Sequence, residues 1–190
     1  MISDLVHQYY ADDRIVEHNM DGVRAYMDMN EALLTNASNT HGYENMPGVL
    51  AQELYGDWAG LYGDPRTHGA DLGTFYFVSD AEIAARWAAL LGNASEAARF
   101  TGMAQAARSA YDQFFFDNAS IAYTDPVYYG AKNFFPISQM LPLALGLEQA
   151  QANGAALLEN LLQSIYSGGH TGYPNASSWG IVGNRYFWPL

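Results

Sequence analysis

The sequence contains no cysteine, a single lysine and no apolar run of about 18 residues that could cross a bilayer. The absence of cysteine excludes a disulfide framework and a thiolate metal site. Lys132 and seven arginines are outnumbered by 20 acidic residues, which gives a net charge of −12. Such a chain offers no basic stripe for phosphates, so we expect neither nucleic acid nor an anionic membrane as a partner. A neutral ligand suits this composition better.

Metal-binding patterns are also missing. The histidines lie far apart and show no ligand spacing, at His7, His18, His41, His68 and His170. We therefore expect no metal and no cofactor.

The cellular location stays open. The first residues have neither the basic start nor the apolar core of a signal peptide. Four Asn-Ala-Ser sequons would suit a secreted protein, and they begin at Asn36, Asn93, Asn118 and Asn175. Helix capping is the simpler explanation for Asn93, because Glu96 follows three residues later as in a capping box. A turn after a helix likewise explains Asn118.

Helical periodicity dominates the chain, and 190 residues suit one globular domain or a part of a larger one. Asp12 and Asp13 can cap a helix that extends to about Leu34. Apolar residues from Phe77 to Leu91 predict a second helix that ends at Gly92. Three further helices are predicted over residues 94–116, 136–148 and 153–166.

The connections between these helices alternate in length. Short links near Gly92-Asn93 and Asn153-Gly154 force antiparallel helical hairpins. The long connections, residues 36–73 and 118–135, should therefore gather at the opposite end and line a pocket. Residues 123–129 could pair as a ribbon, but Pro126 argues against it. The predicted fold class is all-α, built from stacked helical hairpins.

Tyr55-Gly56-Asp57-Trp58 is the most informative motif of the first long loop. It combines a glycine turn, a carboxylate and a large aromatic ring in a segment rich in glycine and proline. Compact domains rarely contain a loop of nearly forty residues that has no function. We therefore interpret this segment as part of the entrance to a ligand-binding pocket.

Several ordered motifs together resemble the (α/α)6 catalytic domain of bacterial-type α-L-rhamnosidases. They cover residues 10–27, 55–58, 83–93, 138–147, 170–172 and 180–186. The resemblance implies an (α/α)6 toroid of helical hairpins. A complete toroid needs twelve helices and far more than 190 residues. We therefore expect residues 1–190 to form a single partial domain, a central to C-terminal slice of the catalytic barrel.

The resemblance also implies inverting hydrolysis of terminal α-L-rhamnosides by two carboxyl groups on opposite faces of the sugar. In this family the general acid belongs to an upstream Asp-Glu-Arg-type motif, and the base is a downstream glutamate. Neither motif occurs here, so no catalytic residue is assigned and the isolated chain is expected to be inactive. Five helical glutamates are expected to be solvated surface charges, namely Glu17, Glu31, Glu82, Glu96 and Glu159.

What the resemblance does transfer is one wall of the sugar subsite. Asp57 would accept hydrogen bonds from sugar hydroxyls, which a carboxylate does strongly. Trp58 would stack on the apolar face or the 6-methyl group of a deoxysugar. Gly56 would allow the sharp turn beneath them, and His170 would add a polar group from a later loop.

Two alternatives remain open. The chain could be a non-catalytic helical binding or scaffold module, or another (α/α)6 glycosidase, such as a trehalase-like or glucoamylase-like enzyme, with a different sugar. A glycosidase would gather aromatic and polar residues at the long-loop end, namely Asp57, Trp58, Tyr62, Tyr128, Tyr129 and His170. The aglycone, the linkage and the oligomeric state stay undetermined.

Overall fold

The computed structural model describes residues 9–35, 42–51, 69–127 and 135–167. The helices and strands within these ranges are α2 Arg14–Thr35, α3 Gly69–Leu90, α4 Ala94–Phe115, β1 Phe116–Asp117, β2 Ala122–Tyr123, α5 Pro136–Leu145, α6 Glu148–Ala152 and α7 Gly154–Ser167. The predicted all-α class is confirmed. No helix among the described residues is both long and apolar enough to cross a membrane.

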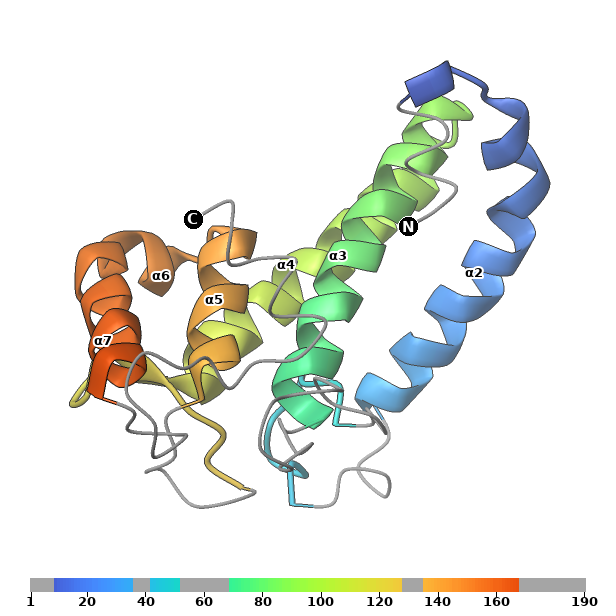
Figure 1. The fold of residues 1–190 in the computed structure, drawn as a ribbon. Helices are drawn as coiled ribbons and strands as arrows, with labels where there is room; N and C mark the ends of the chain where they lie inside the picture. The colour runs from blue at the N-terminus through green and yellow to red at the C-terminus, as the bar shows by residue number, and fades with distance from the viewer. Residues whose placement is uncertain (1–8, 36–41, 52–68, 128–134, 168–190) are drawn as a thin grey trace.

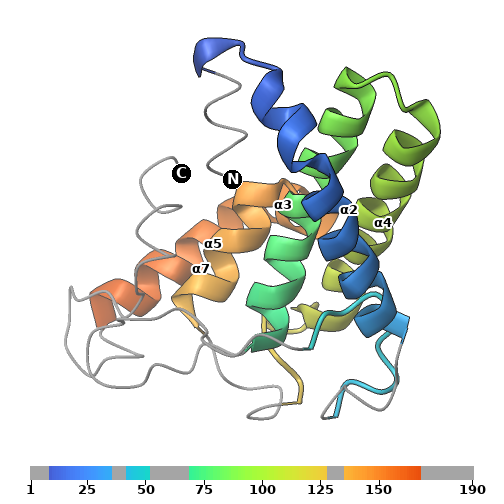
Figure 2. The same ribbon diagram turned by 90° about the vertical axis from the view of Figure 1, so that its right-hand side faces the viewer.

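Helix α3 forms the centre of the fold. Its side chains are buried on nearly all sides, from Ala70 and Leu72 in the first turn to Trp87 and Ala88 in the last. A helix that is apolar all round must lie inside a domain, and α3 packs against α2, α4 and α5. In Figure 1, α2 lies on one side of α3 and α5 and α7 lie on the other, while α4 runs behind it; Figure 2 shows α2 and α4 on the side away from α5 and α7.

The flanking helices are amphipathic. Helix α4 buries Phe100, Ala104, Ala107, Tyr111 and Phe115 along one face and leaves the opposite face exposed. Helix α7 buries only Leu157 and Leu161 among its described residues. The buried inner helices α3 and α5 therefore alternate along the chain with outer helices that have one solvent-exposed face.

Local capping explains where two of the helices begin. Asp12 Oδ1 accepts a hydrogen bond from the Arg14 backbone N–H at 3.1 Å, next to the start of α2. Asn93 Oδ1 accepts one from the Glu96 N–H at 3.1 Å, as an N-cap residue should. The Glu96 side chain completes the motif by accepting from Asn93 Nδ2 instead of from a backbone N–H. The predicted cap at Asn93 is confirmed, whereas Asp12 bonds to the first residue of α2 and not to the second or third, as an N-cap residue would.

Two predicted helix boundaries are wrong, and a ribbon forms that was not predicted. Helix α3 begins at Gly69, inside the run interpreted as a loop, because the polar residues of its first turns are satisfied by tertiary contacts. Helix α5 ends at Leu145, because Gly146 adopts a left-handed φ of 63° and closes it. A two-stranded antiparallel ribbon does form, but it pairs Phe116 with Tyr123 and so precedes Pro126.

The described residues agree with the predicted arrangement of the connections. The short α3–α4 link lies at the top of Figure 1, whereas the described parts of the long connections, residues 42–51 and 116–127, lie at the bottom. The bottom of this view also holds the N-terminal ends of α3 and α5 and the C-terminal end of α7. We call it the long-loop end.

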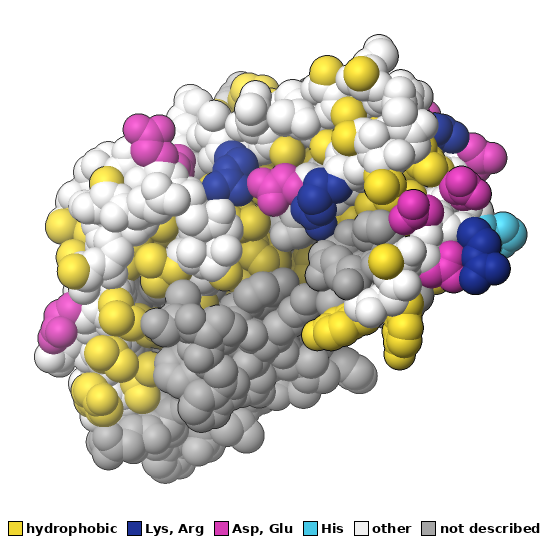
Figure 3. Space-filling model, turned by 90° about the horizontal axis from the view of Figure 1, so that it is seen from above, with side chains coloured by type: hydrophobic (Ala, Val, Ile, Leu, Met, Phe, Trp, Pro, Cys, Tyr) yellow, Lys and Arg dark blue, Asp and Glu magenta, His cyan; other side chains and the backbone are white. Residues whose placement is uncertain are grey.

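The surface carries its charges in pairs. Arg24 bonds to Glu96 at 2.8 Å, and Arg99 bonds to Asp28 at 2.6 Å, so that α2 and α4 are joined twice. Figure 3 views the end with the short α3–α4 link and shows basic side chains next to acidic ones. The prediction that Glu96 is a solvated surface charge is wrong, since its side chain is 15% exposed and paired with Arg24.

Candidate functional site

The long-loop end contains a buried polar cluster at the N-terminal ends of the two inner helices. Asp71 lies in the first turn of α3 and Ser138 in the first turn of α5. The Ser138 hydroxyl donates to Asp71 Oδ2 at 2.5 Å, and the Leu72 backbone N–H donates to Asp71 Oδ1 at 2.7 Å. Asp71 is 2% exposed and Ser138 is 4% exposed. The carboxyl group therefore ties α3 to α5 from inside the protein.

A second buried carboxylate lies in the same region. Asp125 follows β2, and its Oδ1 accepts from the Val127 N–H at 2.9 Å. The Tyr43 hydroxyl, which comes from the connection between α2 and α3, donates to Asp125 Oδ2. Among the described residues, Asp71 and Asp125 are the only carboxylates that are buried. We refer to Asp71, Ser138, Asp125 and Tyr43 as the loop-end cluster.

Burial controls the electrostatics of this cluster. It raises the pKa of Asp71 to about 7, and the charge of Asp125 adds to the effect, while the bond from Ser138 opposes it. Burial also raises the pKa of the nearby Tyr111 hydroxyl well above its ordinary value. Within the described part of the chain this hydroxyl has no hydrogen-bond partner. The cluster thus holds one carboxyl group that takes up a proton near neutral pH.

A buried glutamine fixes the ribbon beside the cluster. Gln139 follows Ser138 in α5 and is fully buried. Its Oε1 accepts from the Tyr123 N–H at 2.8 Å, and its Nε2 donates to the Tyr123 carbonyl at 2.7 Å. A third bond reaches the Phe135 carbonyl at 3.2 Å. The Gln139 side chain therefore satisfies the backbone N–H and carbonyl of Tyr123 in β2, as a neighbouring strand would. It also attaches the α4–α5 connection to α5.

The first long connection is attached in a similar way. The Leu50 N–H donates to Thr74 Oγ1 at 3.0 Å, and the same hydroxyl donates to the Ala70 carbonyl at 2.7 Å. Leu50 precedes the run 52–68 and Ala70 follows it, and these hydrogen bonds place both residues at the N-terminal end of α3.

The site residues predicted from the sequence lie outside the described residues. This holds for Gly56, Asp57 and Trp58, for His170, and for Tyr62, Tyr128 and Tyr129. Their placement as a sugar subsite stays a prediction. The described part of the chain contains no group of three or more His, Asp or Glu side chains that could hold a metal.

The residues of the loop-end cluster were not found from the sequence. Asp71 falls in a run that reads as loop, and Asp125 precedes Pro126, which reads as a turn. Ser138 and Gln139 did carry a usable signal. They are adjacent polar residues in a helix whose neighbours Ile137, Met140 and Leu141 are all apolar and buried, which indicates buried hydrogen bonding.

Buried inner helices, amphipathic outer helices and long connections gathered at one end define a helical-hairpin domain of the six-hairpin glycosidase class. The chain belongs to the bacterial α-L-rhamnosidase six-hairpin glycosidase family, whose domain model matches residues 1–190.

A solved structure is similar to this fold. It is an α-L-rhamnosidase from Dictyoglumus thermophilum, with a TM-score of 0.77 and 24% sequence identity. The match covers 99% of this chain but only 19% of the length of that chain. At this identity the likeness concerns the fold. A search among curated proteins finds no match.

Proposed function

We propose that this chain forms one side of the sugar-binding site of an inverting α-L-rhamnosidase. The observation that carries the proposal is the family match over residues 1–190, together with the position of the described parts of the long connections at one end. In a helical-hairpin barrel that end is where a ligand meets loop residues instead of helix faces.

The subsite itself follows from the Tyr55–Trp58 motif. Asp57 accepts hydrogen bonds from the sugar hydroxyls, Trp58 covers the apolar face of the ring, and Gly56 permits the turn between them. His170 contributes from a second loop. The loop-end cluster supports these loops by fixing the N-terminal ends of α3 and α5 in a common position.

The general acid and base are proposed to come from outside these 190 residues. The sequence has no Asp-Glu-Arg motif. The buried carboxyl groups of the described residues, Asp71 and Asp125, are held by Ser138 and Tyr43 and are 2% and 6% exposed. Inverting hydrolysis needs two carboxyl groups that both reach the sugar, roughly 6.5–9.5 Å apart. Neither aspartate meets this requirement.

Sugar binding tests the subsite separately from catalysis. We expect L-rhamnose to bind the purified chain in isothermal titration calorimetry, and Asp57→Ala to weaken binding by tenfold or more through the loss of charge-assisted hydrogen bonds. Asp64→Ala, in the same loop, is the matched control and should bind like the unmodified chain.

The titration also separates the alternatives. Preference for D-glucose over L-rhamnose would replace the rhamnosidase proposal by another glycosidase of this class. Absence of binding by either sugar would favour a non-catalytic helical module.

A further inference from the structure

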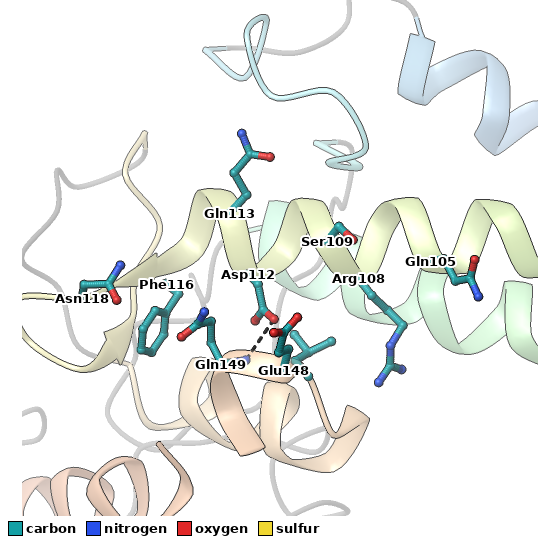
Figure 4. Close-up of a pocket in the computed structure, with 10 residues that line it drawn as sticks. Gln105, Arg108, Ser109, Asp112, Gln113, Phe116, Asn118, Glu148 and Gln149 are labelled. Carbon is teal, nitrogen blue, oxygen red and sulfur yellow. Dashed lines mark hydrogen bonds between the residues drawn. The ribbon is translucent and has the colours of Figure 1, made fainter. Parts of the chain in front are cut away.

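A hollow lined by described residues lies between α4 and α6, and its volume is about 700 Å³. Its lining does not include any member of the loop-end cluster. Figure 4 shows α4 crossing the view, with Arg108 and Asp112 pointing to the side where Glu148 and Gln149 of α6 lie and Gln113 pointing to the opposite side. We call this hollow the α4–α6 groove. Its volume falls within the range of about 300–1,000 Å³ that is typical of small-molecule sites.

Two charged side chains in the groove, Arg108 and Asp112, already make hydrogen bonds within the protein. Arg108 donates to Glu82 at 2.8 Å and to the Leu145 and Gly146 carbonyls at 2.7 and 3.0 Å, at the end of α5. Its guanidinium group thereby satisfies carbonyls at a helix C-terminus.

Asp112 is fixed at both oxygens. Its Oδ1 accepts from the Tyr123 hydroxyl at 2.6 Å, and its Oδ2 accepts from the Gln149 N–H at 3.1 Å, the bond drawn in Figure 4. The side chains of Arg108 and Asp112 are thus already hydrogen-bonded within the fold. A ligand does not need to supply a countercharge.

Uncharged polar groups are available beside them. Gln105, Ser109 and Gln113 follow each other at every fourth position of α4, which places them on one side of the helix. All three are exposed, and none makes a side-chain hydrogen bond within the described part of the chain. The half-buried Phe116, which follows α4 as the first residue of β1, adds an apolar surface to the groove.

This combination indicates a ligand rich in hydroxyl groups. A side-chain amide offers both donors and acceptors, as a hydroxyl group requires, while an aromatic ring accommodates the C–H face of a pyranose. An anion is disfavoured because the exposed Glu148 also lines the groove and the net charge is −12. We propose that the α4–α6 groove is a second binding site for a neutral mono- or disaccharide. The choice of a sugar among polyhydroxylated ligands rests on the proposed function.

The test uses the whole chain, L-rhamnose as the probe, and ¹⁵N chemical shifts of the backbone and of the glutamine side-chain amides. In the Trp58→Ala variant, which removes the stacking surface of the loop-end subsite, we expect residual rhamnose binding that shifts the Gln105 and Gln113 side-chain signals. Adding Gln105→Ala and Gln113→Ala should weaken this residual binding at least fivefold. Gln163→Ala, a change of an exposed glutamine on α7, is the matched control and should leave it unchanged.

Each outcome separates the two sites. Complete loss of rhamnose binding in Trp58→Ala would overturn the groove proposal and leave the loop-end subsite standing. Residual binding that the paired glutamine changes do not weaken would also overturn it. Binding that Trp58→Ala leaves intact and the glutamine changes abolish would support the groove and contradict the loop-end subsite.

Discussion

Asp71 is the residue whose chemistry departs furthest from what its position in the sequence indicates. An aspartate in the first turn of a helix is ordinarily a favourable anion, because the helix N-terminus attracts negative charge. Here burial outweighs that attraction and raises the pKa of Asp71 to about 7. The hydrogen bond from Ser138 to Asp71 connects the two inner helices. The ionised form of Asp71 is unfavourable there, because the protein interior does not solvate its charge.

Protonation of Asp71 should therefore stabilise the fold. Below about pH 3 the group is protonated in both the folded and the unfolded chain. As the pH rises to 7 the unfolded chain ionises first, so the free energy of unfolding falls by on the order of 4 kcal/mol through this group. Asp71→Asn mimics the protonated form. We expect it to be more stable than the unmodified chain at pH 8, with an advantage that shrinks towards pH 4.

Urea unfolding at pH 4.5, 6 and 8 measures this difference. Asp21→Asn is the control, because the Asp21 side chain is 96% exposed, and it should show no comparable gain. A loss of stability in Asp71→Asn that is equal at all three pH values would contradict the interpretation of Asp71 as a strained buried acid.

Gln139 makes a second prediction at the residue scale. Gln139→Ala leaves the N–H and carbonyl groups of the buried Tyr123 without their partners. Unsatisfied buried groups cost about 1–3 kcal/mol each, so we expect a loss of about 3 kcal/mol in the free energy of unfolding. Gln163→Ala, on the exposed side of α7, should change it by less than about 0.5 kcal/mol. If both changes had the same effect on denaturant unfolding, the hydrogen bonds from Gln139 to the Tyr123 backbone would not contribute to stability as proposed.

At the scale of elements, the sequence predicted the helices with regular apolar stripes and clear caps. Helix α4 is the best example, because Asn93 and Glu96 determine its start and the apolar face from Phe100 to Phe115 determines its period. Helix α3 was predicted only in part. Gly69, Asp71 and Thr74 look like loop residues, and only their contacts with other elements make a helix there favourable.

The α4 cap gives a prediction at this scale. Asn93→Ala removes the acceptor for the Glu96 N–H and should destabilise the protein by about 1 kcal/mol. Asn93→Ser keeps a capping oxygen and should recover most of that loss, whereas Asn118→Ala, in an exposed turn, should have little effect. Thermal unfolding of the three variants measures the difference. If Asn93→Ser and Asn93→Ala reduced the stability equally, a capping role of Asn93 would be ruled out.

At the scale of the whole molecule, loop length was a better guide than loop sequence. Alternating short and long connections correctly predicted the α3–α4 hairpin, and the described parts of the long connections lie at one end of the fold. The loop-end cluster could not be predicted in the same way, because Asp71, Asp125 and Tyr43 come from segments far apart in the sequence. Neither hydrophobic periodicity nor residue spacing predicts that side chains from such distant segments lie close together. The family resemblance supplied the subsite residues Asp57, Trp58, Gly56 and His170, and these remain predictions.

Catalysis gives a prediction at the same scale. We expect the isolated chain to show no turnover of an aryl α-L-rhamnoside, because the accessible acid and base pair is proposed to lie outside it. Release of the aryl group, followed by absorbance, measures this. Turnover that Asp57→Ala abolishes and Asp64→Ala preserves would contradict the proposal that the acid and base lie elsewhere.

The position of bound L-rhamnose tests the central claim most directly. A crystal structure of the chain grown with the sugar should show the pyranose ring against Trp58, with its hydroxyl groups on Asp57, at the N-terminal ends of α3 and α5. A sugar bound only elsewhere on the molecule, with Trp58 and Asp57 free of ligand, would contradict the account of the long-loop end as a rhamnoside site.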